Sequence, residues 1–196
     1  GETDNLASWS PNGTQIAYTA SSSGGSLWKM AANGTGKVSV VLGVGYVDSD
    51  PEWSRDGLRF AFETNRTVLP VEGNQYDVWA VDATGAGEIG LTHQSPGTDQ
   101  DPSWSPTRDE IVFVTTRHGV TNAEIYLMNA DGSNLRRMTD HPGGDASPAW
   151  SPDGEYIIFT SNRSGNFEIH VMKRDGTGLT RITNDAATDN WPSWKP

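Results

Sequence analysis

The chain has 196 residues, no cysteine and a formal net charge of −11 at pH 7. Without cysteine there are no disulfides, thiolate metal sites or cysteine nucleophiles, and the acidic balance argues against nucleic acid as a partner, since binding phosphates needs clustered Lys and Arg. No apolar run approaches the roughly 18 residues of a membrane span, so membrane insertion is not expected.

A Trp followed by Ser recurs along the chain, with a Trp-Lys variant as its last occurrence. The anchors are Trp9, Trp53, Trp104, Trp150 and Trp194. Their intervals are 44, 51, 46 and 44 residues, and a period near 40–45 is typical of four-stranded propeller blades. A single repeat has one apolar face and buries it only against its neighbours.

Each repeat is predicted to hold four strands in the same order. A short first strand ends at the anchor Trp, and a turn such as Asn12-Gly13 or Asp153-Gly154 leads into an apolar second strand. The third strands are "SLWKMAANG", "DVWAVDATG", "EIYLMNADG" and "EIHVMKRDG", with period-2 alternation. The fourth strands, such as "LRRMT" and "LTRIT", are polar and bear Arg, which discourages edge-to-edge pairing.

The longest interval is explained by the insertion "TVLPVEGNQY" after Arg66. It is predicted to form a long loop between the second and third strands of the second repeat. Two interpretations stay open, a tolerated surface insertion and a loop that carries binding function.

The third and fourth repeats, "DPSWSPTRDEIVFVTTRHGVTNAEIYLMNADGSNLRRMT" and "SPAWSPDGEYIIFTSNRSGNFEIHVMKRDGTGLTRIT", closely resemble PD40 repeats, the WD40-like blades of TolB-type β-propellers. The resemblance implies an all-β fold, a β-propeller of four-stranded antiparallel blades, with residues 1–196 as a single propeller segment. The blades are expected at about 4–47, 48–98, 99–144 and 145–188, with an extra inner strand at 189–196.

The two ends of the chain do not match. TolB-type propellers usually have six or more blades. This chain has five predicted inner strands, but only four of them are followed by the second, third and fourth strands that complete a blade. Three interpretations are open: part of a larger propeller, a short unit that closes by association with another copy, or four blades that close alone and displace the fifth inner strand. An open arc exposes an apolar face at each end, so we expect a homo-oligomer or a complex with a protein partner that completes the propeller.

An aspartate stands five residues before every anchor Trp. These residues are Asp4, Asp48, Asp99, Asp145 and Asp189. If the inner strands bring them together near a central channel, they form a hard-cation site suited to Ca²⁺, with Asp50 and Asp101 as additional ligands. The other interpretation is a structural Asp–Arg network with Arg66, Arg117 and Arg163, in which the first repeat has Ser22 at the Arg position. A metal, if bound, is expected first near Asp4 or near Asp48 and Asp50, where that Arg is missing.

By analogy with the family, the chain is expected to be a non-enzymatic scaffold for protein–protein interaction in the periplasm or secreted. No catalytic residue or organic cofactor is assigned. One alternative is a metal-dependent carbohydrate-active enzyme or a peptidase-associated propeller, although the chain has no G-x-S-x-G nucleophile motif. A structural, self-assembling fragment is the other. Trp191 is a Trp at a repeat position where the other copies have Leu6, Asp50, Asp101 and Ser147. It is predicted to lie at the channel mouth or at a contact with another chain.

Overall fold

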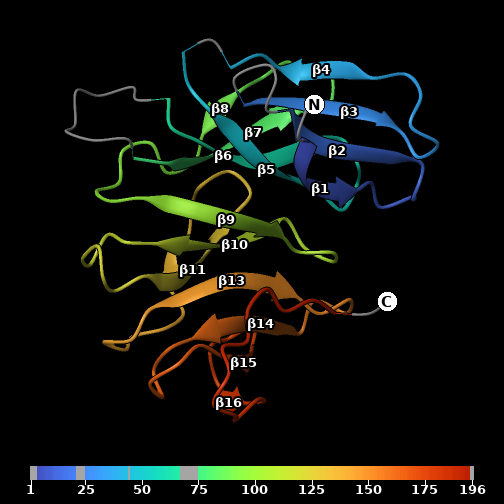
Figure 1. The fold of residues 1–196 in the computed structure, drawn as a ribbon. Coiled ribbons are helices and arrows are strands. Elements are labelled where there is room, and N and C mark those ends of the chain that lie inside the picture. Colours follow the sequence, from blue (N-terminus) through green and yellow to red (C-terminus); the bar gives the residue numbers. More distant parts are fainter. Residues whose placement is uncertain (1–3, 21–24, 44, 67–74, 195–196) are drawn as a thin grey trace. The chain divides into compact units, whose positions relative to one another are not determined.

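The computed structural model describes residues 4–20, 25–43, 45–66 and 75–194 (Figure 1). Over these residues, sixteen strands form four four-stranded antiparallel sheets, and no helix is present that could cross a membrane. Each sheet is one sequence repeat with its strands in consecutive order, which confirms the predicted all-β blades. Of the predicted insertion at 67–76, residues 67–74 lie outside the described part of the chain, and Gln75 and Tyr76 lie in no strand.

The strand bounds of the four blades follow the repeat. Blade 1 holds β1 (Asp4–Trp9), β2 (Gln15–Ala20), β3 (Ser26–Ala31) and β4 (Val38–Val41). Blade 2 holds β5 (Asp48–Trp53), β6 (Arg59–Thr64), β7 (Asp77–Asp82) and β8 (Ile89–Gly90). Blade 3 holds β9 (Asp99–Trp104), β10 (Glu110–Thr115), β11 (Glu124–Asn129) and β12 (Arg136–Arg137). Blade 4 holds β13 (Asp145–Trp150), β14 (Tyr156–Ser161), β15 (Glu168–Lys173) and β16 (Thr180–Arg181).

The chain divides into two compact units, each holding two blades. Unit one spans residues 1–94 with blades 1 and 2, and unit two spans residues 95–196 with blades 3 and 4. In unit one, β5 lies against β1, β2 and β3, and in unit two β13 lies against β9, β10 and β11. The inner strand of one blade therefore crosses the sheet of the blade before it.

The apolar core of each unit lies between its two sheets. In unit two, Val112, Val114, Ile125 and Leu127 of blade 3 pack against blade 4. The blade 4 residues in that core are Trp150, Ile157, Phe159 and Met172. In unit one, Ala17 and Leu27 of blade 1 pack in the same way against Trp53, Phe60 and Val81 of blade 2. Each blade thus has a leading face, which contacts the preceding blade, and a trailing face, which contacts the following one.

The Ser after the anchor Trp closes the first hairpin of a blade. The Ser151 hydroxyl donates to Asp153 and accepts the Tyr156 N–H at 2.9 Å. Ser54 makes the same pair of bonds in blade 2, with Asp56 and Arg59. These bonds add to the backbone hydrogen bonds of the turn, such as Ser151 N–H to Tyr156 O, and explain why Ser and Asp recur after the anchor.

Every inner strand has a kink that the sequence did not reveal. In β1, β5, β9 and β13 one residue adopts a left-handed φ of 50–51°, and strand pairing shifts register at that point, while Trp191 has the same φ in the unpaired segment 189–194. In chain order the residues are Leu6, Asp50, Asp101, Ser147 and Trp191. A positive φ is uncommon outside Gly, and here it forms a β-bulge that bends the strand. The five side chains share no chemical type, but a Pro follows the bulged residue in four of the five copies, as Pro51, Pro102, Pro148 and Pro192.

The predicted extra inner strand keeps this backbone shape but lies in no strand over residues 189–194. Its Asp189 N–H donates to Phe167 O at 2.9 Å, as the Asp145 N–H does to Ala123 O at 2.8 Å. The segment therefore leaves blade 4 as an inner strand leaves the blade before it. Among the described residues, no second strand pairs with it, so the ladder that would make it a strand is missing.

Candidate functional site

Three of the predicted aspartates open the inner strands β5, β9 and β13, and their side chains are fully buried. Each accepts a hydrogen bond from the Arg that stands 18 positions later in the same blade. The pairs are Asp48–Arg66 at 2.8 Å, Asp99–Arg117 at 3.3 Å and Asp145–Arg163 at 2.9 Å. The predicted Asp–Arg network is confirmed at these positions, and each pair lies within one blade.

Each of these arginines is fixed by a hydroxyl at the end of the second strand. The Nε of Arg117 donates to Thr115 at 3.0 Å, and that of Arg163 donates to Ser161 at 2.8 Å. The guanidinium of Arg117 also lies 4.7 Å from the ring centre of Tyr126. A guanidinium held in this way is oriented for its carboxylate before the pair forms.

Blade 4 has His170 where blade 3 has Tyr126. The buried His170 ring stacks on Phe159 with 5.8 Å between ring centres. Burial lowers the pKa of His170, and the positive charge of Arg163 lowers it further, against an upward contribution from the hydrogen bond to Glu168 O. The imidazole is therefore held in its neutral form.

In blade 2, Arg66 bonds both Asp48 and Glu88. Burial raises the pKa of Asp48, against the hydrogen bonds from Thr64 and Arg66. Burial lowers the pKa of Arg66, but the hydrogen bonds and charges of its two carboxylate partners outweigh that effect, and the net shift is upward. Both shifts have structural causes, a desolvated acid and the cation that neutralises it.

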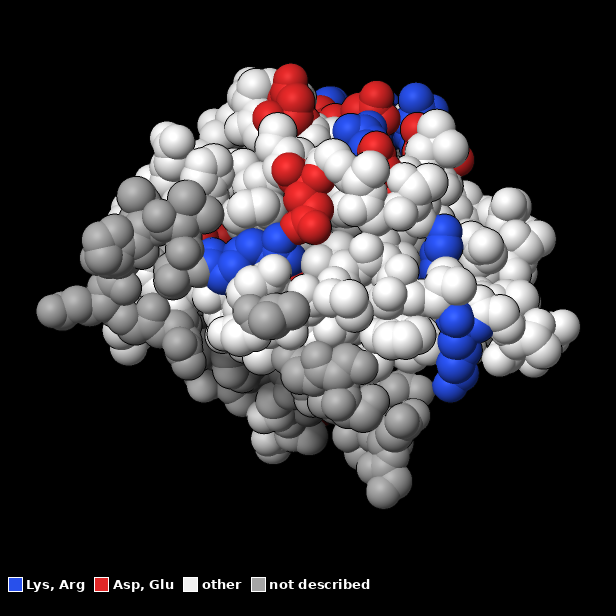
Figure 2. All heavy atoms as spheres, turned by 90° about the horizontal axis from the view of Figure 1, so that it is seen from above, with Lys and Arg blue, Asp and Glu red and all other residues white. Residues whose placement is uncertain are grey.

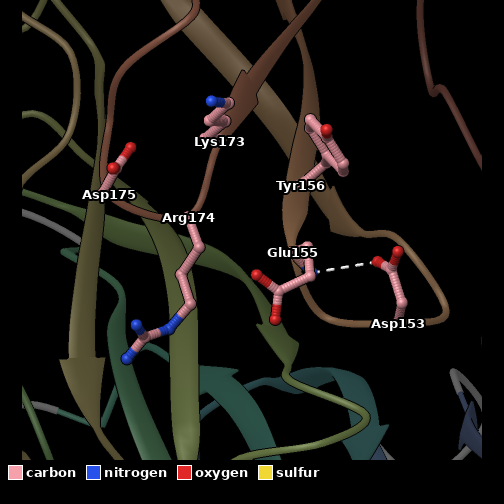
Figure 3. Close-up of a pocket in the computed structure, with 6 residues that line it drawn as sticks. All are labelled: Asp153, Glu155, Tyr156, Lys173, Arg174 and Asp175. Atoms are coloured by element: carbon pink, nitrogen blue, oxygen red, sulfur yellow. Dashed lines mark hydrogen bonds between the residues drawn. The ribbon is translucent and has the colours of Figure 1, made fainter.

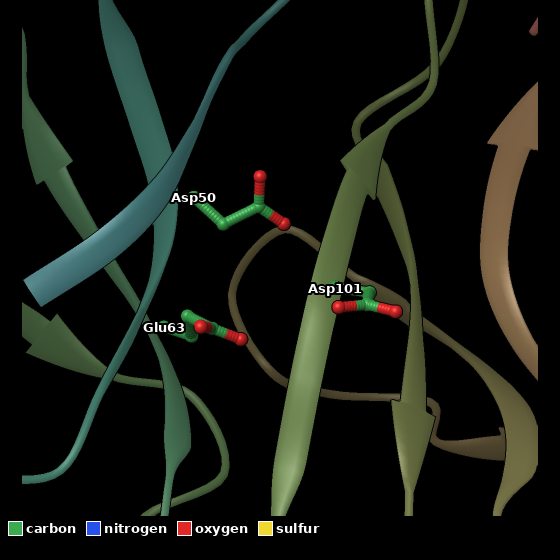
Figure 4. A group of neighbouring side chains, drawn as sticks. All are labelled: Asp50, Glu63 and Asp101. Atoms are coloured by element: carbon green, nitrogen blue, oxygen red, sulfur yellow. The ribbon is translucent and has the colours of Figure 1, made fainter. Parts of the chain in front are cut away.

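The other carboxylates of the predicted calcium site are placed as follows. Asp50 lies on β5 of unit one, where Figure 4 also shows Glu63 of β6, which accepts from the Ser49 hydroxyl at 2.8 Å. In unit two, Asp101 accepts the Ser147 N–H at 3.1 Å, and burial raises its pKa. Asp189 is half-buried, whereas the Asp4 side chain and all of Ser22 lie outside the described residues. The calcium site stays a prediction.

A second set of buried carboxylates was missed by the sequence reasoning. An acid opens the third strand of blades 2, 3 and 4, and a Thr 15 positions later donates to it. The pairs are Asp77–Thr92 at 3.4 Å, Glu124–Thr139 at 2.6 Å and Glu168–Thr183 at 2.6 Å. The constant 15-residue spacing was visible in the sequence and is the signal that could have found it.

The same Thr also accepts a backbone N–H at 2.9 Å from the residue after the acid, so one hydroxyl joins the third strand to the segment after the edge strand. In blade 4, Arg181 of the edge strand completes the group, with 2.6 Å to Glu168. The Thr183 hydrogen bond lowers the pKa of Glu168, and Arg181 lowers it further. The edge-strand Arg therefore also fixes a buried carboxylate.

Two hollows adjoin Tyr156 on blade 4, and neither was expected from the sequence. The first has a volume of about 520 Å³ and lies between two turns (Figure 3). It is lined by Asp153, Glu155, Tyr156, Lys173, Arg174 and Asp175. The second measures about 410 Å³ and is lined by Ser151, Pro152, Asp153, Tyr156, Val171 and Trp194. The first is polar, and the second, beside Trp194, is mainly apolar.

The surface charge has no concentrated basic region in the view of Figure 2. Lys and Arg are few on this face, and several of them lie directly beside Asp or Glu. The absence of a nucleic-acid partner stays a prediction from the net charge.

A family model described as the TolB beta propeller domain, PD40, matches residues 94–196. The chain belongs to this family. A TolB homologue of Chlorobium luteolum is 32% identical over 120 residues, which are 61% of this chain and 25% of that protein. YuxL of Bacillus subtilis, named as an uncharacterized peptidase, is 30% identical over 92 residues, 47% of this chain and 14% of that protein. The chain thus spans a quarter or less of these two relatives.

Solved structures give the same fold. A TolB-like protein from Agrobacterium tumefaciens superposes with a TM-score of 0.82 at 26% identity, over 97% of this chain and 65% of that one. An oligogalacturonate lyase in complex with manganese superposes with a TM-score of 0.69 at 17% identity, over 97% of this chain and 57% of that one. The second likeness shows a shared fold and nothing about activity.

Proposed function

We propose that this PD40 propeller is a non-enzymatic scaffold that binds protein partners. The observation that carries the proposal is the apolar hollow of about 410 Å³ beside Trp194, with Tyr156 and Val171 in its wall. Trp and Tyr are enriched where protein surfaces meet, because they combine large apolar area with a polar group. The hollow takes an apolar side chain of a partner.

The repeated charges support a structural use of the acids rather than a catalytic one. Asp48, Asp99 and Asp145 are each bonded to an Arg of their own blade. Glu124 and Glu168 are each bonded to a Thr and an Arg. A general acid or base must reach a substrate proton, and carboxylates that are buried and paired in this way are poorly placed to do so.

Binding is tested by selecting peptides from a displayed library on the immobilised chain. We expect selected peptides to lose at least tenfold affinity for Val171→Lys, because a charge at the hollow opposes burial of an apolar side chain. Val120→Lys is the matched control, since Val120 lies on a loop of blade 3 and is 89% exposed. Peptides that bind wild type and Val171→Lys equally well would contradict the proposed site.

The enzymatic alternative is tested with oligogalacturonate and Mn²⁺, followed by absorbance of the unsaturated product. We expect no turnover above the protein-free reaction. Turnover that Mn²⁺ stimulates and a chelator removes would replace the scaffold proposal with a lyase.

We further propose a periplasmic or secreted location, which rests on the TolB relatives. Fractionation of cells that produce the natural full-length protein tests it. Recovery in the osmotic-shock fraction or the medium is expected, and recovery with a cytoplasmic marker would contradict it.

A further inference from the structure

The anchor Trp residues differ in how well they are covered. Trp53, Trp104 and Trp150 are only 3–7% exposed, whereas Trp9 is 59% and Trp194 is 37% exposed. The three buried anchors belong to blades 2, 3 and 4. The two exposed ones lie on the inner strand of blade 1 and in the segment that follows blade 4.

The trailing face of blade 4 has the composition of a blade–blade contact. In blade 3, the trailing-face residues Val112, Ile125 and Leu127 are completely buried by blade 4. The same positions in blade 4 are occupied by Ile158, Ile169 and Val171. All three are half-buried. These residues are aliphatic, as in blade 3, and they differ from the blade 3 residues only in being less buried.

The leading face of blade 1 matches the surface that covers blade 3. Blade 4 covers it with Trp150, Ile157 and Met172. The same three positions in blade 1 hold the same residue types, as Trp9, Ile16 and Met30. Trp9 is exposed, and Ile16 and Met30 are half-buried. Blade 1 therefore carries the surface that fits a trailing face like that of blade 4.

The segment after blade 4 duplicates the first strand of blade 1. Residues 189–194 read "DNWPSW" and β1 reads "DNLASW", so four of six positions are identical. Trp191 and Leu6 share a φ of 50° at the bulge. β1 is paired with β2, whereas residues 189–194 have the inner-strand shape without a strand partner among the described residues.

We propose that blade 1 of a second copy docks on the trailing face of blade 4, and that residues 189–194 replace β1 of that copy against its β2. The contact is head-to-tail and swaps one strand. The register follows from β1, in which Ser8 stands opposite Ala17 and Trp9 opposite Ile16. In the exchanged pair, Ser193 stands opposite Ala17, and Trp194 opposite Ile16. This inference rests on the proposed function, with the partner now a second copy.

A disulfide between the predicted partners tests the exchange, because the chain has no other cysteine. In Ala17→Cys with Ser193→Cys, we expect covalent dimers and larger species on a non-reducing gel. In the matched control, Ala17→Cys with Ser8→Cys, oxidised at a concentration where the chain is monomeric, we expect a cross-link within one chain, because β1 is then paired with β2. A cross-linked monomer in the first variant would overturn the proposal, because the chain then closes on its own blade 1. Uncross-linked chains, with the control oxidised, would also overturn it.

The molar mass in solution gives an independent measure by light scattering. We expect wild type and Val120→Lys to exceed the monomer mass of 21.2 kDa, and Val171→Lys to return to it. A monomeric wild type overturns the exchange whatever the cross-links show. If the monomeric wild type binds selected peptides and the Val171→Lys variant does not, the scaffold proposal is supported without self-association. If the chain self-associates but no peptide binder can be selected, the strand exchange is supported and the proposed binding of other proteins is contradicted.

Discussion

Blades 3 and 4 are built alike and differ in what covers one face. Both hold the buried Asp–Arg pair of the inner strand and the Glu–Thr pair of the third strand. Yet Ile125 of blade 3 is completely buried, and the matching Ile169 of blade 4 is half-buried. These two polar pairs are therefore internal to each blade, whereas burial of the trailing face depends on the next blade, as in other repeat architectures.

The largest effect is expected from breaking the internal ion pair. Arg117→Met in blade 3 and Arg163→Met in blade 4 each leave a buried aspartate without its cation, which costs about 3–5 kcal/mol of unfolding free energy. Urea unfolding measures both variants. Because the pair is internal, the two costs should be equal.

The control for these variants is Arg108→Met. Its pair with Glu155 is largely exposed, with side chains 36% and 56% accessible. Exposed pairs contribute about 0–1 kcal/mol, so this variant should unfold almost as wild type does. A much smaller cost for Arg163→Met than for Arg117→Met would break the comparison, since the pair would then depend on the neighbouring blade.

The matched isoleucines test the covered and open faces directly. Ile125→Ala should cost about 3–4 kcal/mol, because it leaves a cavity in a closed core, and Ile169→Ala about 1–2 kcal/mol. Unfolding is followed at a concentration where the chain is monomeric. Equal costs would mean that the trailing face of blade 4 is already covered. At concentrations at which two copies associate, the loss of unfolding free energy in Ile169→Ala should rise toward that in Ile125→Ala.

The hydroxyl of the Glu–Thr pair should matter equally in both blades. Thr139→Val and Thr183→Val each remove a donor to a buried carboxylate and an acceptor for a backbone N–H, at a cost of about 1–3 kcal/mol. Thermal unfolding compares them with Thr121→Val at an exposed loop position, which should stay within about 0.5 kcal/mol of wild type. A neutral Thr183→Val would show that blade 4 does not use the bond.

The sequence predicted what repeats in residue type, and it missed what repeats only in backbone shape. The Trp anchor and the aspartate before it recur by type, so the sheets and the Asp–Arg pairs were predictable. The bulge holds Leu6, Asp101 and Trp191 with a shared left-handed φ, so the bulged residue itself has no common type, and the Pro that follows it in four copies was overlooked. The hollows beside Tyr156 are lined by residues from separate segments, 151–156, 171–175 and 194, which no single sequence motif marks.

The smallest expected effect is a pH dependence of stability that blade 4 has and blade 3 lacks. The pKa of His170 lies below its ordinary value of 6.5, first because the ring is buried and then because Arg163 is near, while Asp145 acts in the opposite direction and Arg181 in the same one. The unfolded chain therefore takes up the proton first as the pH falls. The stability tied to neutral His170 is complete above about pH 6.5 and is lost progressively below it, down to the depressed pKa of the folded state.

His170→Tyr places the blade 3 residue in blade 4 and should flatten this slope. Melting temperatures at pH 7.5 and 5 measure it, and we expect wild type to lose more stability than the variant over that interval. Thr121→Val, a change at an exposed position that carries no charge, is the control and should keep the wild-type slope. An unchanged slope in His170→Tyr would mean that the carboxylates of both blades carry the whole acid sensitivity. Blade 4 would then differ from blade 3 only in what covers its trailing face.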